Sequence, residues 1–248
     1  KDIYYNKKIA IDAEKIKFPD KTYYWSDLSS VRLRGRKHFK YLFTSTAFGA
    51  AELYFKDNTS RFLFDDFYLH PWKWKIFVQK VIIEGSLHWK KPDTPDHCTA
   101  NMDDNYESYS GSFFTSLRGI TLIAFTVPFG LAILTSIGSQ PLSSFLYIGI
   151  AELCFLTFTG HLSHYFHLGS EYLIVRNHIL FWKRRAFKLS DIAEVSIDNR
   201  HGLPNFLKFS TGDFKTYTFF AGTLRDKTWL KLKERLEEHG IEVKNYVI

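Results

Sequence analysis

The chain has 248 residues, of which 45% are hydrophobic and 18% are aromatic, and its formal net charge is +7. This length allows one large domain or two small ones. The positive charge suits a surface that meets anionic lipid or nucleic acid, without deciding between them. Only two cysteines are present, Cys98 and Cys154, so a disulfide-rich domain is excluded and no metal-binding spacing exists.

Residues 1–91 are predicted to form a domain of short strands closed by a helix. Apolar runs such as KIAID, KTYYW, AELYF and RFLFD alternate with turn sequences such as PDK and KDNTS. The segment PWKWKIFVQKVIIEG then has apolar residues at helical spacing, at Trp74, Phe77, Val78 and Val81. The N-terminal residues alternate charged and apolar side chains without a continuous apolar stretch, so no signal peptide is expected.

Five basic residues fall within nine positions of this domain, around Gly35, at a predicted hairpin tip. They are Arg32, Arg34, Arg36, Lys37 and Lys40. Near a membrane each could contribute about 1 kcal/mol toward anionic headgroups. They form the predicted lipid-binding or partner-binding site, although a solvated hairpin tip explains them equally well.

Residues 92–112 are predicted to form a flexible acidic linker. They include five acidic residues, no basic residue and many turn-forming residues.

Two apolar stretches within residues 113–167 predict a transmembrane helical hairpin. Residues 119–138 carry no charge, and residues 141–160 carry one. Each stretch of 20 residues would form a helix roughly 30 Å long, which matches the hydrocarbon thickness of a bilayer. A pair of buried core helices is the alternative, but the first stretch lacks the polar stripe that such a helix normally shows.

Basic flanks set the predicted orientation. Arg118 precedes the first stretch, whereas Arg176, Lys183, Arg184 and Arg185 follow the second, and the turn between the stretches has no Lys or Arg. Because basic flanks stay in the cytoplasm, the sequence predicts a multi-pass protein of the inner (cytoplasmic) membrane with both termini cytoplasmic.

Glu152 is the single charged residue of the second stretch. A carboxylate within a membrane span costs several kcal/mol unless it is protonated, paired or facing water. An intramembrane assembly role is therefore predicted, with Glu152 packed against polar atoms of the hairpin or of a partner's helix. An ion pathway is the less favoured alternative, because two helices alone cannot enclose one.

Three histidines follow at three-residue spacing, His161, His164 and His167. On a helix, successive members of this series rotate by about 60°, so the three side chains cannot converge well on one ion. No metal site is predicted, and the histidines are interpreted as interfacial residues.

Residues 168–248 repeat the order of the first domain. The apolar runs EYLIV, HILFWK, AFKLS, AEVSID, FLKFS and TYTFF precede a segment with helical spacing at Trp229, Leu232 and Leu236, with Gly240 as its stop signal. The phrase WSDLSSV, residues 25–31, corresponds to LSDIAEV, residues 189–195. Asp27 and Asp191 are interpreted as fold-forming corners, where a Ser-Asp pair before a strand can form an Asx-type turn or cap backbone amides, rather than as catalytic carboxylates.

This order of elements resembles bacterial pleckstrin-homology-like (PH-like) domains, including those fused to transmembrane hairpins. The resemblance rests on WSDLSSV and LSDIAEV with the strands and helix that follow each, and on the opening YLIVRNHILF of the second half. It covers about two thirds of the chain. It implies that each half is a strongly bent antiparallel sheet plugged by a C-terminal helix. The predicted fold class is thus a membrane α+β protein, with a two-span hairpin between two PH-like domains.

The predicted function is that of a non-enzymatic scaffold or accessory protein of the inner membrane. Its two PH-like modules would bind protein or anionic lipid, and its predicted partners are membrane lipids and a protein partner or a homo-oligomer. No catalytic motif, cofactor fingerprint or nucleic-acid recognition element is found in the sequence. The alternatives are a membrane-embedded immunity protein that neutralises a toxin and, less favoured, an oligomeric channel or transporter subunit.

Overall fold

The structure of the chain is a computed structural model that describes residues 9–41, 44–86, 105–136, 142–199 and 203–247. These residues form two compact units. The first unit holds the described residues up to Ser86, and the second holds nearly all of those from Asn105 onward. Four β-sheets and four α-helices are present in the described ranges.

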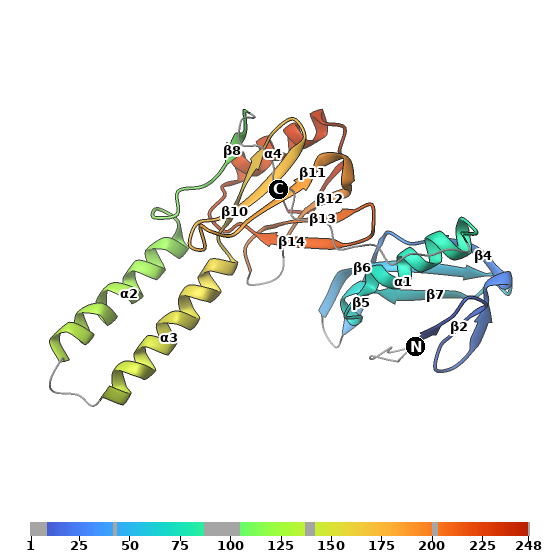
Figure 1. The fold of residues 1–248 in the computed structure, drawn as a ribbon, viewed down its shortest axis with the longest axis horizontal. Coiled ribbons are helices and arrows are strands. Elements are labelled where there is room, and N and C mark those ends of the chain that lie inside the picture. The colour runs from blue at the N-terminus through green and yellow to red at the C-terminus, as the bar shows by residue number, and fades with distance from the viewer. Residues whose placement is uncertain (1–8, 42–43, 87–104, 137–141, 200–202, 248) are drawn as a thin grey trace. The chain divides into compact units, whose positions relative to one another are not determined.

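Unit 1 consists of two antiparallel sheets and a helix (Figure 1). The first sheet contains β1 (Ala10–Ile11), β2 (Lys15–Lys17) and β3 (Thr22–Tyr24). The second sheet is built on the long strand β6, which pairs with the other three strands. Its strands are β4 (Leu28–Arg32), β5 (Arg36–Tyr41), β6 (Thr44–Phe55) and β7 (Ser60–Phe64).

The predicted helix at the end of unit 1 is confirmed. It begins as α1 (Pro71–Phe77) and continues as a π-helical segment, Val78–Ile83. Proline at the first helical position fits the start, because its missing N–H has no intrahelical partner there. Ile76 and Val78 are buried against Leu53 and Leu63 of the second sheet.

Unit 2 contains two four-stranded sheets. The first has the order β11-β10-β9-β8 and the second the order β14-β13-β12-β15, with β15 parallel to β12. The strands of the first sheet are β8 (Glu107–Tyr109), β9 (His164–Leu168), β10 (Tyr172–Asn177) and β11 (Arg184–Lys188). Those of the second are β12 (Ile192–Asp198), β13 (Phe206–Thr211), β14 (Thr216–Phe220) and β15 (Val243–Asn245).

Helix α4 (Asp226–Glu238) closes the core of unit 2, as the sequence predicts. The side chains of Trp229, Leu232 and Leu236 are fully buried, because their spacing puts them on one face of the helix. Gly240 ends the helix with a φ of +78°, a left-handed conformation that glycine adopts without steric cost.

The two repeated phrases form the same corner in the two units. WSD of the first phrase and LSD of the second each form a 3₁₀ turn. The carbonyl of Asp27 accepts a hydrogen bond from the amide of Lys56, and the carbonyl of Asp191 accepts one from Gly212, both at 2.8 Å. The following strands, β4 and β12, both carry a one-residue register shift directly after their first residue. The predicted corners are therefore present.

The predicted role of the aspartate side chains at these corners is wrong. No hydrogen bond from a backbone amide to the carboxylate of Asp27 or Asp191 is found among the described residues. The carboxylates instead accept hydrogen bonds from the preceding hydroxyls, Ser26 at 3.5 Å and Ser190 at 3.3 Å. The backbone carbonyl, rather than the side chain, connects the corner to the partner strand.

The predicted pair of antiparallel helices exists as α2 (Leu117–Ser136) and α3 (Leu142–His161), which lie side by side in Figure 1. Asn177 fixes the end of α3 to the sheet. Its side-chain amide donates to the carbonyl of Gly160, and its side-chain oxygen accepts from the amides of Ile179 and Leu180 at 2.9 and 2.8 Å.

The membrane prediction for these helices is wrong. No helix of the described residues combines the length and the apolar character needed to cross a membrane. The predicted fold class, a membrane α+β protein with a two-span hairpin, and the predicted multi-pass localisation in the inner membrane are corrected accordingly.

Several predicted boundaries differ from the structure. β9 begins at His164, where the sequence predicts the end of a helix, and β8 lies within the segment predicted as a linker. The predicted strand HILFWK is a turn between β10 and β11, in which Lys183 donates its backbone N–H to the carbonyl of Leu180 at 2.8 Å. The first part of the predicted linker, residues 92–104, lies outside the described residues.

Truncating the buried face of α4 should destabilise unit 2. We expect Leu232→Ala to lower the free energy of unfolding by about 2–5 kcal/mol, because a fully buried leucine leaves a cavity. Leu230→Ala is the matched control, since Leu230 is 40% exposed, and it should cost less than about 1 kcal/mol. Equal losses in urea unfolding would contradict the assigned packing.

Candidate interaction surfaces

Four of the five basic residues of the predicted site lie on two consecutive strands, and Arg34 lies in the bend between these strands. Arg32 ends β4, whereas Arg36, Lys37 and Lys40 belong to β5. Both strands pair with β6, and the carbonyl of Gly35, between them, accepts a hydrogen bond from Ala50 of β6 at 3.0 Å. The predicted hairpin tip at Gly35 is therefore wrong, because the chain continues along β6 there instead of reversing.

The pairing register divides the basic residues between the two faces of this sheet. Arg32 lies opposite Glu52 and Lys37 lies opposite Phe48, so these two side chains share the face of Glu52. Arg36 lies opposite Gly49 and belongs to the other face, where its guanidinium donates to the carbonyl of Ala47 at 3.4 Å. The five residues do not form one basic patch.

Glu52 is a buried acidic residue that the sequence analysis did not identify. Its carboxylate lies 3.9 Å from Nζ of Lys37 and accepts a hydrogen bond from the hydroxyl of Tyr54 at 2.7 Å. This hydrogen bond raises the pKa of Tyr54. Lys37 also lies over the ring of Phe62, 4.3 Å from its centre. Part of the basic charge is thus balanced within the sheet.

The same face carries a cluster of four aromatic rings, each partly exposed: Phe39, Phe48, Phe64 and Phe67. The ring of Phe39 lies 5.1 Å from that of Phe67 and 5.3 Å from that of Phe64, in edge-to-face contacts. Such contacts stabilise an aromatic cluster beyond the burial of its area. Packing of side chains on the face of the sheet that carries Glu52 therefore explains the aromatic cluster.

The outer edge of β4 and β5 is not paired with any described strand. An unpaired edge is a template for aggregation, and natural proteins often protect such edges with Lys and Arg. The basic residues of β4 and β5 lie along this edge. Edge protection is therefore a sufficient physical reason for their presence.

Helices α2 and α3 contact each other through a hydrogen bond and a ring pair. The hydroxyl of Thr126 donates to the carboxylate of Glu152, and the rings of Phe125 and Phe155 lie 5.4 Å apart. The sequence predicted that Glu152 contacts polar atoms of the hairpin, and Thr126 supplies them. Placing a carboxylate among apolar side chains costs less free energy when the carboxylate accepts a hydrogen bond than when it has no partner.

The remaining faces of α2 and α3 form the largest group of exposed apolar side chains in the described residues. Eleven large apolar residues are 42–72% exposed. They form what we call the hairpin surface: Ile120, Ile123, Phe125, Val127, Leu131, Leu134, Leu146, Tyr147, Ile150, Leu153 and Phe158. At roughly 150–250 Å² for a large side chain, they leave on the order of 1,000 Å² exposed. The largest contiguous apolar patch of a monomeric protein is typically about 300–600 Å² and is often functional.

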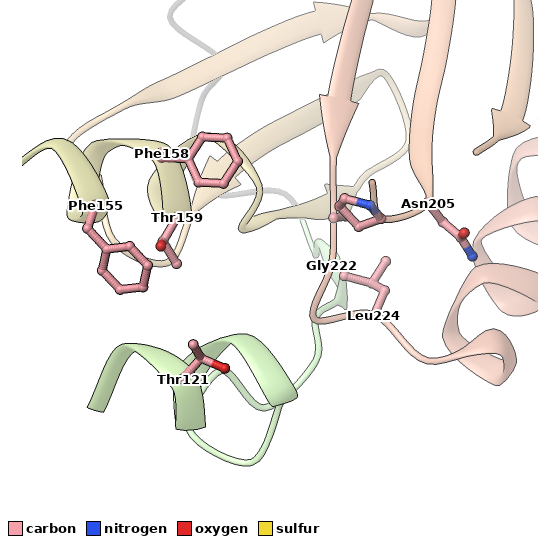
Figure 2. A pocket seen from close by; sticks show the side chains of 9 residues that line it. Thr121, Phe155, Phe158, Thr159, Asn205, Gly222 and Leu224 are labelled. Carbon is pink, nitrogen blue, oxygen red and sulfur yellow. The ribbon is translucent and has the colours of Figure 1, made fainter. Parts of the chain in front are cut away.

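A cleft of about 440 Å³ lies where the hairpin meets the loops of unit 2. Figure 2 shows Thr121 and Phe155 on its helical side and Leu224 on its loop side. Its lining is mainly apolar, and its volume lies within the range of small-ligand pockets. The lining residues are Thr121, Phe155, Phe158, Thr159, Pro204, Asn205, Ala221, Gly222 and Leu224. Because Phe158 also belongs to the hairpin surface, the cleft and that surface are continuous.

The three predicted histidines do not share one environment. His161 ends α3 and is exposed, whereas His164 and His167 belong to β9, where residues three apart point to opposite faces. Nδ1 of His164 lies 3.0 Å from the carbonyl of Phe220. No group of three potential metal-binding side chains is close enough to hold an ion in the part of the chain that the structure describes.

Burial lowers the pKa of three histidines of unit 2. They are His164, His167 and His178. Arg176 and Arg184 lower the pKa of His167 further. The ring of His178 packs against those of Tyr165 and Phe113, with centres 4.5 and 5.8 Å apart. The fold therefore favours the neutral form of these side chains.

The sequence analysis missed Glu52, the hairpin surface as a contact area, and the cleft. Glu52 occupies an outward position of AELYF, a run treated only as an apolar strand. Its pairing with Arg32 follows from the register, which the sequence did not reveal. The cleft brings together residues of α2, α3 and two loops, and no local pattern connects these segments.

No family model matches this chain, and no curated protein is significantly similar to it.

Neutralising the edge of β4 and β5 should promote aggregation. In the variant Arg32→Thr, Arg36→Thr, Lys40→Thr, we expect faster growth of light scattering at neutral pH than in the unchanged chain, because the unpaired edge loses its charge. The control removes three positive charges from α4 with Lys227→Gln, Lys231→Gln and Lys233→Gln. Equal scattering of the two variants would show that net charge, not the edge, matters.

Acid should destabilise unit 2. Because burial lowers the pKa of His178, the unfolded chain binds protons more readily than the folded one. The free energy of unfolding should therefore be constant above the usual histidine pKa of about 6.5 and should fall as the pH drops below it.

We expect His178→Phe, which keeps the ring contacts, to make this fall shallower between pH 6.5 and 5 in urea unfolding. At pH 8 the two proteins should differ by less than about 1 kcal/mol. An unchanged slope would contradict the burial of a neutral His178.

Proposed function

We propose that this chain is a non-enzymatic scaffold protein that binds a protein partner through the hairpin surface. The observation that carries the proposal is the exposure of eleven large apolar side chains on α2 and α3. The exposed apolar area, on the order of 1,000 Å² in total, is divided between the outward sides of the two helices, roughly 500 Å² on each. Exposed apolar area of this size marks an interaction site.

The cleft supports the same proposal. Binding energy in protein interfaces concentrates in a few large side chains that fill pockets near the centre of the contact. The cleft lies beside the hairpin surface, offers the rings of Phe155 and Phe158, and has a volume suited to one large apolar side chain. A partner can therefore anchor one side chain in the cleft while it covers the helices.

The β-rich units are the parts that such a scaffold would present. Both contain the same corner, followed by antiparallel strands, four in unit 1 and three in unit 2, and then by a helix, which supports one type of module used twice. The resemblance of the sequence to PH-like domains fits this arrangement and remains a prediction. A protein with two related modules and one apolar contact surface suits an accessory role in a complex.

Protein binding is favoured over anionic-lipid binding by the positions of the basic residues. A headgroup site needs several cations converging on one phosphate. Arg32 and Lys37 lie on one face of their sheet and Arg36 on the other, while Glu52 balances part of the charge. The basic strand pair therefore lacks the convergence that a headgroup requires.

Photo-crosslinking from the hairpin surface tests the proposal. With p-benzoylphenylalanine in place of Leu153, which is 65% exposed, irradiation of cells should give one sharp protein adduct, because a bound partner covers α3. The same residue in place of Leu230, 40% exposed on α4, should give no such adduct. Adding Leu146→Glu to the Leu153 probe should abolish the adduct, because a buried charge opposes binding. Absence of an adduct, or an adduct that Leu146→Glu leaves unchanged, would reject the proposed function.

A further inference from the structure

We infer that the partner on the hairpin surface is further copies of this chain, with each hairpin packed between two others in an oligomer of at least three chains. The inference rests on the proposed function, since it names the partner of the same surface. It follows from where the exposed side chains lie on the two helices, and from the chemistry of those side chains.

Five of the six exposed large apolar residues of α2 form one stripe, and the sixth, Phe125, faces α3. Ile120, Ile123, Val127, Leu131 and Leu134 follow one another at intervals of three and four residues, and all are at least 42% exposed. This spacing is that of the apolar seam by which helices pack together. At 100° per residue, the centre of the stripe lies about 150° from the mean direction of Phe125 and Thr126, the two residues that contact α3. The stripe therefore points away from α3.

Three of the five exposed large apolar residues of α3 form a second stripe, and the other two, Tyr147 and Phe158, lie about 100° from its direction. Leu146, Ile150 and Leu153 are spaced by four and three residues and are 51–65% exposed. Their common direction lies about 150° from Glu152 and Phe155, which contact α2. This stripe points away from α2. The hairpin thus has apolar seams on two opposite sides, and one neighbour can cover only one of them.

The chemistry of the seams favours a second copy over a charged partner. Glu152 is the only Asp, Glu, Lys or Arg in residues 119–136 and 142–161, and its hydrogen bond to Thr126 lies within the hairpin. Neither seam carries a charged side chain that could pair with a charge on a partner. An apolar, uncharged helix of matching length is therefore the complementary surface, and another copy of α2 or α3 is one.

Two seams on opposite sides determine the size of the assembly. If α2 of one chain packs on α3 of the next, the contacts are heterologous, and they form a ring when the rotation between neighbours closes. If α2 packs on α2 and α3 on α3, two isologous contacts alternate around a closed oligomer. In both cases each hairpin has two neighbours, so the smallest complete assembly has more than two chains.

The mass of the purified full-length chain tests the inference, measured by light scattering coupled to size exclusion in a mild detergent that disperses non-specific apolar contacts. We expect a defined complex of at least three chains. Two differently tagged copies expressed together should purify together. A monomer or a dimer would overturn the inference.

Substitutions of single seams provide the decisive variants. Leu131→Glu with Leu134→Glu changes the α2 seam alone, and Leu146→Glu with Leu153→Glu changes the α3 seam alone. Each pair should reduce the complex to a dimer if the contacts are isologous, or to a monomer if they are heterologous. The control Leu230→Glu on α4 should leave the mass unchanged, and unchanged mass in either seam variant would overturn the inference. Urea unfolding of each variant verifies that unit 2 remains folded.

Cys154 supplies a second measurement that does not depend on substituting a seam. It is a free, exposed cysteine on α3, next to Leu153. In a Cys98→Ser background a spin label on Cys154 should show dipolar coupling between chains, and dilution with unlabelled chain during co-expression should weaken it. Absence of coupling, combined with a photo-adduct of a different protein at Leu153, would overturn the inference and leave the proposed function standing. Absence of both signals would reject the two proposals together.

Discussion

The backbone hydrogen bonds at the two corners determine the register on which the rest of each unit depends. In unit 1 the carbonyl of Asp27 accepts from Lys56, the residue after β6, and in unit 2 the carbonyl of Asp191 accepts from Gly212, the residue after β13. Each bond fixes the start of one strand against the end of its partner, and a one-residue shift follows directly. Because side chains alternate along a strand, this placement decides which ones enter the core. Val195 and Ile197, for instance, are fully buried on β12.

Register also explains why the basic residues do not act together. Arg32 and Lys37 are five positions apart, a separation that puts side chains on opposite faces of a continuous strand. The pairing of β4 and β5 with β6 differs by one residue, so the two side chains return to the same face, beside Glu52. Arg36, adjacent to Lys37, then falls on the other face. The basic residues that are close together in the sequence therefore point to both faces of the sheet. Their charge is spread along the unpaired edge of β4 and β5.

The sequence predicted the parts of the fold that local patterns determine. Trp229, Leu232 and Leu236 recur at helical spacing, and all three are fully buried in α4. The repeated phrase predicted two equivalent corners, because a short turn with a fixed register is encoded within a few residues. The two apolar stretches predicted two antiparallel helices, which α2 and α3 confirm.

What the sequence did not predict depends on contacts between distant segments. His164 and His167 continue a helical pattern in the sequence, yet they belong to β9, because pairing with β10 outweighs local preference. The membrane prediction was based on the length of the two uncharged stretches, whereas no helix of the described residues combines the length and the apolar character needed to cross a membrane. The sequence did not predict the cleft, because the loops near Pro204 and Leu224 lie beside the helices only in the folded unit.

The bond between Thr126 and Glu152 links the internal structure of the hairpin to what it presents outside. A carboxylate among apolar side chains must find a donor, and the nearest helix provides one. This contact turns Glu152 and Thr126 toward each other, and with them Phe155 and Phe125. The helical repeat then leaves the seams of α2 and α3 directed away from each other. A single polar pair therefore orients both helices, and the opposite directions of the two apolar seams are a consequence of it.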